Sequence, residues 1–472
     1  MRKHLALALS AAMLAGLISG CAPSASDPTP APASPGATQP AAQTGGDKKD
    51  VVEIEFWNSA EGNVGIALQA RVDAFNATVG AEKGIHVNDV FQGSDVMEKL
   101  KTLAQAKDFA HFPDVGQIYS AGIPALVGLD VTLPIDDIYA AGTYDVSVAK
   151  EDIVPNFART YTYAGKLISM PLNASSLLLY YNKDAARAAG LDAEDPPKTM
   201  AELADWTDKL TVRDGNTVTR YGLNIQIDRY ELVNFLVGIS PTGCNFIGDN
   251  EGGRADMMTK LTIGEDGSLH KFLTEWQKVI ATGGYKPVND NEKEEFAAGV
   301  SAMNFQSTSQ LQTMIALAEG KFDLGVAPLP RCTEDDNFGA SVGGGSLTMF
   351  DSGDPARVAA TWEFVQYMAS PETQLAFSLD TGYLPVNEKT YELADWLKHL
   401  EDEPLAKVAV DQMRISDPGM QEPFDIINWE LNSLVQSNMI DFADGKIDMA
   451  TCENNIVDGF DAKLAEYIRA NT

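Results

Sequence analysis

Histidine and cysteine are scarce in this chain, and their positions give no metal site. The 472 residues include five histidines and four cysteines, and no H-E-x-x-H or C-x-x-C motif brings two of them together. The acidic runs 292–295 and 334–336 lack the D-x-[DN]-x-[DN]-G pattern of a calcium loop. Both runs are expected to be solvated surface. The sequence therefore predicts no metal and no cofactor.

Positive charge is also in short supply. Lysine and arginine together number 35, against 67 aspartates and glutamates, which gives a formal net charge of −32. Such a surface repels nucleic acid and anionic lipid headgroups, so we expect neither as a partner. The overall charge does not determine the local charge of a buried ligand site.

The glycine-rich segment Ser341–Leu347, SVGGGSL, lacks the residues of a nucleotide site. No lysine follows the glycines as in a phosphate-binding P-loop, and Ser346–Phe350 predicts a strand where a dinucleotide fold requires a helix. Two interpretations stay open. The glycines could form a tight turn into the strand, or they could let bare backbone approach a ligand closely.

Long apolar runs are absent beyond the amino terminus, so no transmembrane helix is predicted. Leu5–Ile18 is too short for a stable anchor and, after Arg2 and Lys3, is typical of a signal peptide covering residues 1–20. The end of this run, LISGC, resembles the bacterial lipobox. That resemblance implies acylation of its cysteine, and the alternative is a secretory signal followed by an incidental cysteine.

The acylated residue would be Cys21, and residues 21–50 would follow it as a tether. This stretch is rich in proline and small residues and is expected to be disordered. Three cysteines remain: Cys244, Cys332 and Cys452. At most one disulfide can form among three thiols within the chain, and the pairing stays open.

Strand and helix patterns alternate from residue 51 onward, which predicts parallel βαβ units with ligands at the carboxyl ends of the strands. Thr199 and Glu202 form a capping box that predicts a helix to Leu210. The expected strands are Val51–Trp57, Ile85–Phe91, Asp114–Ile118, Ser176–Asn182, Tyr221–Gln226 and Val300–Phe305. The expected helices near the carboxyl terminus are Ala356–Met368, Glu372–Leu379, Pro423–Asn438 and Ala450–Arg469.

Five segments in this order resemble the extracellular solute-binding proteins of bacterial ABC importers. They are FWNSAEG, PLNASSLLLYYNKDAARAAGLDAEDPPKTMAELADW, VSAMNFQSTS, VGGGSL and TGYLPVN. The resemblance covers essentially residues 51–472 and is greatest to the glycerol-3-phosphate-binding branch, which is close to the carbohydrate binders. It implies a periplasmic-binding-protein-like II fold of class α/β, with two lobes joined by a hinge and a ligand cleft between them.

The resemblance also implies how the chain divides between the lobes. Lobe I is expected from 51–173 and 304–353, and lobe II from 174–303 and 354–472. The crossings between lobes are then expected near Asn173–Ser176, Ala302–Phe305 and Ser352–Asp354.

Four ligand contacts of the family match residues of this chain: Ser175, Ser307, Gly344 and Tyr383. Three others are lost. The family's glutamate falls at Ser120, an early tyrosine falls near Asp95 or Val96, and the arginine that meets the phosphate falls near Phe424.

The loss of that arginine bears on the ligand. A buried phosphate dianion requires a charged donor, whereas aromatic faces with hydroxyl and amide groups suit sugars. The candidate aromatic platforms are Trp57, Tyr119, Tyr230, Tyr383, Phe424 and Trp429, and the candidate polar contacts are Asn58, Glu61, Gln117 and Asn173.

Several of these residues have a structural alternative. Trp57, Trp429 and Tyr230 could be core residues. Glu61 could be a helix N-terminal acid, and Ser307 could cap the helix that begins near residue 309.

The sequence thus predicts a substrate-binding lipoprotein, not an enzyme, held by Cys21 at the extracytoplasmic face of the bacterial cell membrane. We expect a monomer that captures a carbohydrate by hinge closure and delivers it to the transmembrane subunits of an ABC permease. The alternative ligand is glycerol 3-phosphate or a glycerophosphodiester. A remote alternative is a secreted, lipid-anchored glycoside hydrolase, since two suitably placed carboxylates would suffice for that reaction.

Overall fold

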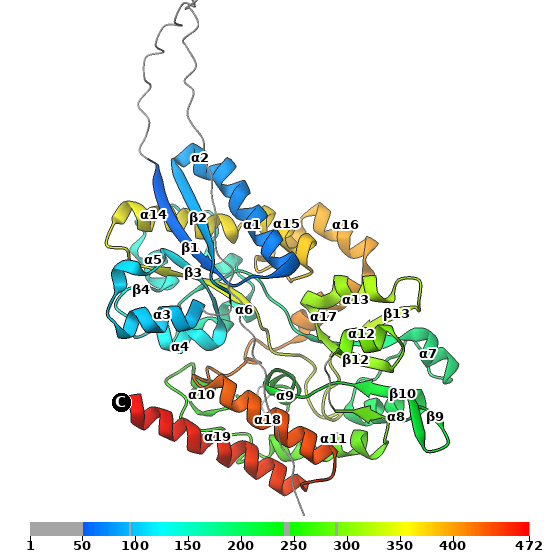
Figure 1. Ribbon diagram of the computed structural model, residues 1–472. Helices are drawn as coiled ribbons and strands as arrows, with labels where there is room; N and C mark the ends of the chain where they lie inside the picture. Colours follow the sequence, from blue (N-terminus) through cyan, green and yellow to red (C-terminus); the bar gives the residue numbers. More distant parts are fainter. Residues whose placement is uncertain (1–50, 94–95, 240–245, 288–290, 472) are drawn as a thin grey trace, which may run out of the picture. The chain divides into compact units, whose positions relative to one another are not determined.

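The computed structural model describes residues 51–93, 96–239, 246–287 and 291–471 (Figure 1). The predictions for the signal peptide, Cys21 and the tether lie outside these residues, and so does Cys244.

The first sheet is built around β1, whose neighbours on both sides run parallel to it. The segment VEIEFWN alternates between core and surface over its first half and is wholly buried at Phe56, Trp57 and Asn58. The order is β2-β1-β3-β14-β4, with β7 paired to β14, and β14 runs antiparallel to β3. The bounds are β1 (Val52–Asn58), β2 (Ile85–Phe91), β3 (Val115–Tyr119), β4 (Thr132–Leu133), β7 (Met170–Pro171) and β14 (Gly345–Phe350).

Helices from both ends of the chain pack on this sheet. The amino-terminal α1 lies against α15, and α14 packs on β1, while α3 packs on β3. Asp354 caps α14 by accepting a hydrogen bond from the Ala356 amide at 2.9 Å, and Pro355 occupies the first helical position. The bounds are α1 (Gly62–Ala77), α2 (Val79–Lys83), α3 (Val96–Gln105), α4 (Ile123–Leu126), α5 (Ile135–Ala141), α6 (Pro155–Thr160), α14 (Pro355–Met368) and α15 (Pro371–Thr381).

The second sheet repeats the arrangement of the first. Its central strand β10 has parallel neighbours β11 and β12, and β8 runs antiparallel to β12 and β13. The order is β11-β10-β12-β8-β13, with β9 paired to β10. The bounds are β8 (Leu177–Asn182), β9 (Val212–Asp214), β10 (Thr217–Asn224), β11 (Tyr285–Lys286), β12 (Ser301–Ser307) and β13 (Leu324–Ala327), and a separate hairpin pairs β5 (Thr162–Tyr163) with β6 (Lys166–Leu167).

The predicted capping box is confirmed at the start of α8. The Thr199 hydroxyl accepts from the Glu202 amide at 3.2 Å, and the Glu202 carboxylate accepts from the Thr199 amide at 3.1 Å. The helices α18 and α19 lie side by side on this half of the molecule (Figure 1). The bounds are α7 (Lys183–Ala188), α8 (Met200–Leu210), α9 (Arg229–Leu236), α10 (Asp249–Gly253), α11 (Ser268–Ala281), α12 (Glu292–Ala297), α13 (Leu311–Ala318), α16 (Ala394–Asp402), α17 (Pro404–Ile415), α18 (Asn428–Ala443) and α19 (Met449–Asn471).

The predicted helix over Pro423–Asn438 starts five residues late, at Asn428. The preceding segment is irregular because its backbone groups bond elsewhere. The Phe424 amide donates to the Gly252 carbonyl at 2.7 Å, and the Pro423 carbonyl accepts from the buried Arg229 guanidinium at 3.1 Å.

The chain passes between the two sheets at three places, and only the first matches the expected positions. It crosses after β7 at 172–176, between β13 and β14 at 328–344, and after α15. β12 and β13 belong to the second sheet, whereas α14 packs on β1 of the first sheet. The sheets therefore divide the chain differently from the expected ranges 304–353 and 354–472, because strand partnership depends on long-range hydrogen bonds that local patterns do not encode.

Two further findings concern the described part of the chain. None of its helices has the length and apolar character needed to span a bilayer, and none of its histidine, cysteine and acidic side chains cluster in threes for a metal ion. Cys332 and Cys452 are both buried free thiols. Burial raises the pKa of each to about 12, so both stay protonated at neutral pH.

Candidate functional site

A cavity of about 440 Å³ opens where β1 and β3 end. This is the edge at which the ligands of parallel sheets gather. The loop after β1 and the first turn of α1 form one wall, and a residue from the crossing after α15 closes the other side. The lining residues are Ser59, Ala60, Glu61, Val64, Val96, Met97, Gln117, Tyr119 and Tyr383.

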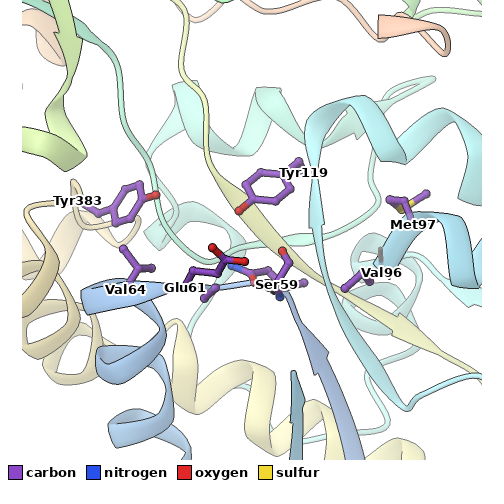
Figure 2. A pocket seen from close by; sticks show the side chains of 9 residues that line it. Ser59, Glu61, Val64, Val96, Met97, Tyr119 and Tyr383 are labelled. Carbon is purple, nitrogen blue, oxygen red and sulfur yellow. Dashed lines mark hydrogen bonds between the residues drawn. The ribbon is translucent and has the colours of Figure 1, made fainter. Parts of the chain in front are cut away.

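Two tyrosines face each other across this cavity. Figure 2 shows the hydroxyls of Tyr119 and Tyr383 pointing toward one another, with the Glu61 carboxylate lying between them. The Tyr383 ring stacks on Phe377 at a centroid distance of 6.3 Å, whereas Tyr119 is 46 % exposed. Burial raises the pKa of Tyr383 to about 12, so its hydroxyl is a neutral donor at physiological pH. The arrangement offers two donors, a carboxylate acceptor and two ring faces within one cavity.

Glu61 is exposed and free to meet a ligand. It occupies the N-cap position of α1, but its side chain makes no capping hydrogen bond. The alternative that Glu61 is a helix N-terminal acid is confirmed in position, and its carboxylate also lines the cavity.

Gln117 fixes the wall of the cavity. It is 2 % exposed, and its side-chain oxygen accepts from the Ser59 amide at 3.0 Å, which holds the loop after β1. Asn173 is equally buried and accepts from the Gly345 amide at 3.2 Å. Both amides therefore position backbone next to the cavity.

The glycine-rich segment packs against the first crossing. Ser175 and Gly343 exchange two backbone hydrogen bonds of 2.9 Å each, and the Leu384 amide donates to the Ala174 carbonyl at 2.8 Å. Gly344 has φ of 142°, and a Cβ there would lie 2.0 Å from the Asn173 carbonyl oxygen. Gly344 thus allows two crossing segments to touch, and it is not among the residues that line the cavity.

A buried ion network lies behind Gly343. Arg229 donates to both oxygens of Asp425, each at 2.6 Å, and to the Glu422 Oε2 at 3.0 Å. All three residues are at most 8 % exposed. A Cβ on Gly343 would lie 3.2 Å from the Glu422 Oε1 and 3.6 Å from the Tyr230 ring, so Glu422 turns its second oxygen toward the glycine.

Phe424 is 2 % exposed and is covered by an arginine from another segment. The Arg254 guanidinium lies 4.1 Å from the centre of the ring, and it donates to the Glu422 carbonyl at 2.5 Å. Burial lowers the pKa of Arg254 to about 9. A positive charge does lie beside the position where the family's arginine is missing, but backbone carbonyls and a ring already surround it.

Trp57, Asn58 and Trp429 do not reach the cavity. The Trp57 indole donates to Glu55, and the Asn58 amide donates to Asp89 while its oxygen accepts from the Ala60 amide at 3.0 Å. Trp429 is 78 % exposed at the start of α18, so the alternative that it is a core residue is wrong.

The remaining two candidates, Ser307 and Tyr230, are not among the residues that line the cavity. Ser307 accepts from the Ser309 amide at 3.3 Å, which confirms its capping role at the short helix that follows. The Tyr230 hydroxyl is buried and makes no hydrogen bond in the part of the chain that the structure describes. No signal in the sequence marked Arg229, Glu422 and Tyr161, because their burial and their contacts arise only when distant segments of the chain meet.

Comparisons with known proteins agree with this architecture. Residues 70–404 match the family described as bacterial extracellular solute-binding protein. The sn-glycerol-3-phosphate-binding periplasmic protein UgpB of Pectobacterium atrosepticum is 28 % identical over 377 residues, which is 78 % of this chain and 80 % of that protein.

Two solved structures show the same fold. The sugar-binding protein MalE from Xanthomonas citri superposes with a TM-score of 0.71 at 20 % identity, covering 89 % of this chain and 99 % of that one. UgpB from Mycobacterium tuberculosis in complex with glycerophosphocholine gives 0.69 at 24 % identity, covering 88 % and 99 %. These similarities confirm the predicted two-lobe α/β fold and the family resemblance seen in the sequence.

Proposed function

Because the chain belongs to the bacterial extracellular solute-binding proteins, we propose that it captures a carbohydrate outside the cytoplasm and delivers it to the membrane permease of an ABC importer. The chain crosses between the sheets three times, and the second and third crossings each form a β-bridge with the first. These three crossings would serve as the hinge on which the lobes close. A ligand that contacts both lobes would favour the closed state, since it binds that state better.

The observation that carries the proposal is the cavity at the ends of β1 and β3, with Tyr119 and Tyr383 facing each other over Glu61. Aromatic faces pack on the C–H patches of a sugar ring, and hydroxyl and carboxylate groups bond its hydroxyls. A volume of about 440 Å³ suits a small sugar.

A thermal-shift panel tests this function directly. Purified protein is melted with neutral mono- and oligosaccharides, sugar alcohols, sn-glycerol 3-phosphate and glycerophosphocholine, each at millimolar concentration. A ligand at about 100 times its Kd stabilises the folded state by about 2.7 kcal/mol, which is readily measured. We expect a neutral saccharide to raise the Tm, and a rise with the phosphate compounds alone would contradict the carbohydrate proposal.

Glycerol 3-phosphate or a glycerophosphodiester is the second candidate ligand, because UgpB relatives are named for such compounds. Against it, the two buried guanidinium groups around Glu422 are already engaged. Arg229 is paired with Asp425 and Glu422, and Arg254 with backbone carbonyls and the Phe424 ring. No lysine or arginine is among the described residues that line the cavity, so a phosphate bound there would lack the charged donor that normally holds it.

We further propose that the protein is a binding protein without catalytic activity and that Cys21 carries its lipid anchor. Incubation of any bound glycan, followed by analysis of the products, should return the glycan intact. Cys21→Ala should move the protein from the membrane fraction to the medium of the producing cells. If the variant stays with the membrane, the anchor lies elsewhere.

A further inference from the structure

Two buried phenol hydroxyls and a buried carboxylate lie outside the residues that line the cavity. Tyr161 follows α6 and is 2 % exposed within the core of the first sheet. Tyr230 lies on α9 against the core of the second sheet. Glu422 lies in the irregular segment before α18 and is 7 % exposed. We call these three residues the inner cluster.

Both hydroxyls of the inner cluster lack a hydrogen bond among the described residues, although both are shielded from solvent. A buried hydroxyl without a partner costs free energy, so its persistence calls for an explanation. The Ser307 side chain lies close enough to the Tyr230 hydroxyl to lower the pKa of Tyr230 as a hydrogen-bonding group, so Tyr161 is the clearer case of an unpartnered hydroxyl.

Contacts between distant segments bring the three residues near one another. The Arg254 guanidinium donates to the Glu422 carbonyl at 2.5 Å and to the carbonyl of Thr160, the residue before Tyr161, at 3.5 Å. A Cβ on Gly343 would lie 3.2 Å from the Glu422 Oε1 and 3.6 Å from the Tyr230 ring.

Burial raises the pKa of Tyr161 well above its usual range, and the next contributions come from Glu422, Tyr119 and Tyr383. For Tyr230, burial is again the main cause of a raised pKa, followed by Glu422. Both phenols are therefore within the electrostatic reach of Glu422 and of Tyr383 in the cavity wall.

Glu422 is held in one orientation with one oxygen left over. Its Oε2 accepts from Arg229, whose other donors bind Asp425 and the Pro423 carbonyl. Its Oε1 would lie only 3.2 Å from a Cβ on Gly343, so the glycine keeps a side chain away from this oxygen. The network thus presents a fixed negative acceptor. If Arg229 turned to a ligand, Asp425 and Glu422 would stay buried without their counter-charge.

This combination of groups selects one ligand chemistry. The phenols need an acceptor and Glu422 needs a donor, and a hydroxyl group supplies both at once. A phosphate could accept from the phenols but would place its charge against Glu422. A quaternary ammonium group neither donates nor accepts hydrogen bonds.

We infer that Tyr161, Tyr230 and Glu422 form an inner subsite that binds a hydroxyl group of a neutral polyol and excludes phosphate. This inference rests on the proposed carbohydrate-binding function and names the residues that determine its ligand class. Since Tyr161 and Tyr230 pack on different sheets, a ligand bound here also links the two lobes.

The first test needs no ligand. Tyr161→Phe and Tyr230→Phe remove only an unpartnered hydroxyl, so the Tm of the free protein should stay the same or rise. Tyr181→Phe is the matched control, because Tyr181 is also 2 % exposed but its hydroxyl donates to the Ala193 carbonyl at 2.9 Å. The control should melt lower. If Tyr161→Phe melts as low as the control, the hydroxyl has a structural partner and the inference is wrong.

The second test measures affinity by calorimetry, with a neutral saccharide from the thermal-shift panel and with sn-glycerol 3-phosphate. Each of the two cluster variants should bind the saccharide about tenfold more weakly, while Tyr181→Phe binds it as the wild type does. Glu422→Gln keeps the shape but removes the charge, so its affinity for sn-glycerol 3-phosphate should rise about tenfold or more. Gly343→Ala should weaken saccharide binding by filling the space beside Glu422.

The outcomes separate the two proposals. If no neutral saccharide raises the wild-type Tm, the proposed carbohydrate function fails and the inner subsite fails with it. If a saccharide binds the wild type and both phenylalanine variants equally, the function stands and the inner subsite is wrong. Wild-type binding of sn-glycerol 3-phosphate that Glu422→Gln does not improve would likewise overturn the exclusion of phosphate.

Discussion

Two pairs of tyrosines border the candidate site, and they differ in how their hydroxyls are satisfied. Tyr119 and Tyr383 line the cavity, where water can meet their hydroxyls when no ligand is bound. Tyr161 and Tyr230 lie behind them, where their hydroxyls are shielded from water and have no partner among the described residues. The outer pair can exchange water for ligand at little cost, whereas the inner pair gains a hydrogen bond that it otherwise lacks.

The difference shows why residues of one type can have different roles around one site. An exposed tyrosine contributes a ring face and a hydroxyl whose net gain is small, because water already bonds it. A buried tyrosine contributes selectivity, because its hydroxyl stays without a hydrogen bond when the ligand offers it no partner. Substitutions in the residues that support the inner pair should therefore have larger effects than substitutions in the outer pair.

The largest expected effect comes from removing the support of the inner cluster. Arg229→Ala would leave Asp425 and Glu422 buried without their counter-charge, and we expect a loss of about 3–5 kcal/mol in the free energy of unfolding. Urea denaturation measures this loss. Arg187→Ala is the control, since Arg187 makes its ion pairs on the exposed surface and its removal should leave the urea midpoint almost unchanged. Similar midpoints for the two variants would show that the buried network is not essential to the fold.

The next effect concerns the close contact between crossing segments. Gly344→Ala should destabilise the fold by at least about 2 kcal/mol, because its φ of 142° and the Asn173 carbonyl leave no place for a Cβ. Gly343→Ala is the neighbouring control, since its φ lies outside the left-handed region and its nearest contact is a side-chain oxygen at 3.2 Å. Its Tm should stay close to that of the wild type. Equal losses at both positions would argue against a specific role for Gly344.

The outer pair should affect binding more than stability. Tyr383→Ala removes a ring face and a donor from the cavity, so we expect about a tenfold loss in affinity for the saccharide identified in the thermal-shift panel. Calorimetry measures this change, and Trp429→Ala serves as the control because Trp429 is 78 % exposed and lies outside the cavity lining. An unchanged affinity in Tyr383→Ala would mean that the saccharide binds elsewhere.

The smallest effect appears only at alkaline pH. A tyrosine in the unfolded chain ionises near pH 10, whereas the pKa of Tyr383 in the folded protein is about 12. The unfolded state therefore releases this proton first, so the stability that Tyr383 contributes is intact below pH 10 and is lost as the pH rises toward 12. Denaturation midpoints of wild type and Tyr383→Phe, compared across this range, should converge. Parallel curves would show that Tyr383 titrates normally.

Much of the fold could be predicted from local patterns. The alternation of VEIEFWN located β1 to within a residue, and Ile85–Phe91 matches β2. The capping box at Thr199 fixed the start of α8, because its hydrogen bonds join residues only three apart.

The site was predicted only in part. Glu61, Gln117, Tyr119 and Tyr383 are brought together because three of them lie at or just beyond strand ends, where ligands of such sheets bind, and the fourth belongs to a recognisable motif. Trp57 and Trp429 were equally attractive as aromatic residues, yet one faces the core and the other faces solvent. Side-chain type does not reveal which face an element turns toward the cavity.

The amino-acid sequence by itself determined the family, the alternation of strands and helices and the acidic surface, because these depend on composition or on residues close together in the chain. Only the tertiary structure decided which strands share a sheet, where the chain crosses, and that Arg229 is neutralised by Glu422 and Asp425 almost 200 residues later. Burial and ion pairing arise when distant segments meet, so the inner cluster becomes visible only once the chain is folded.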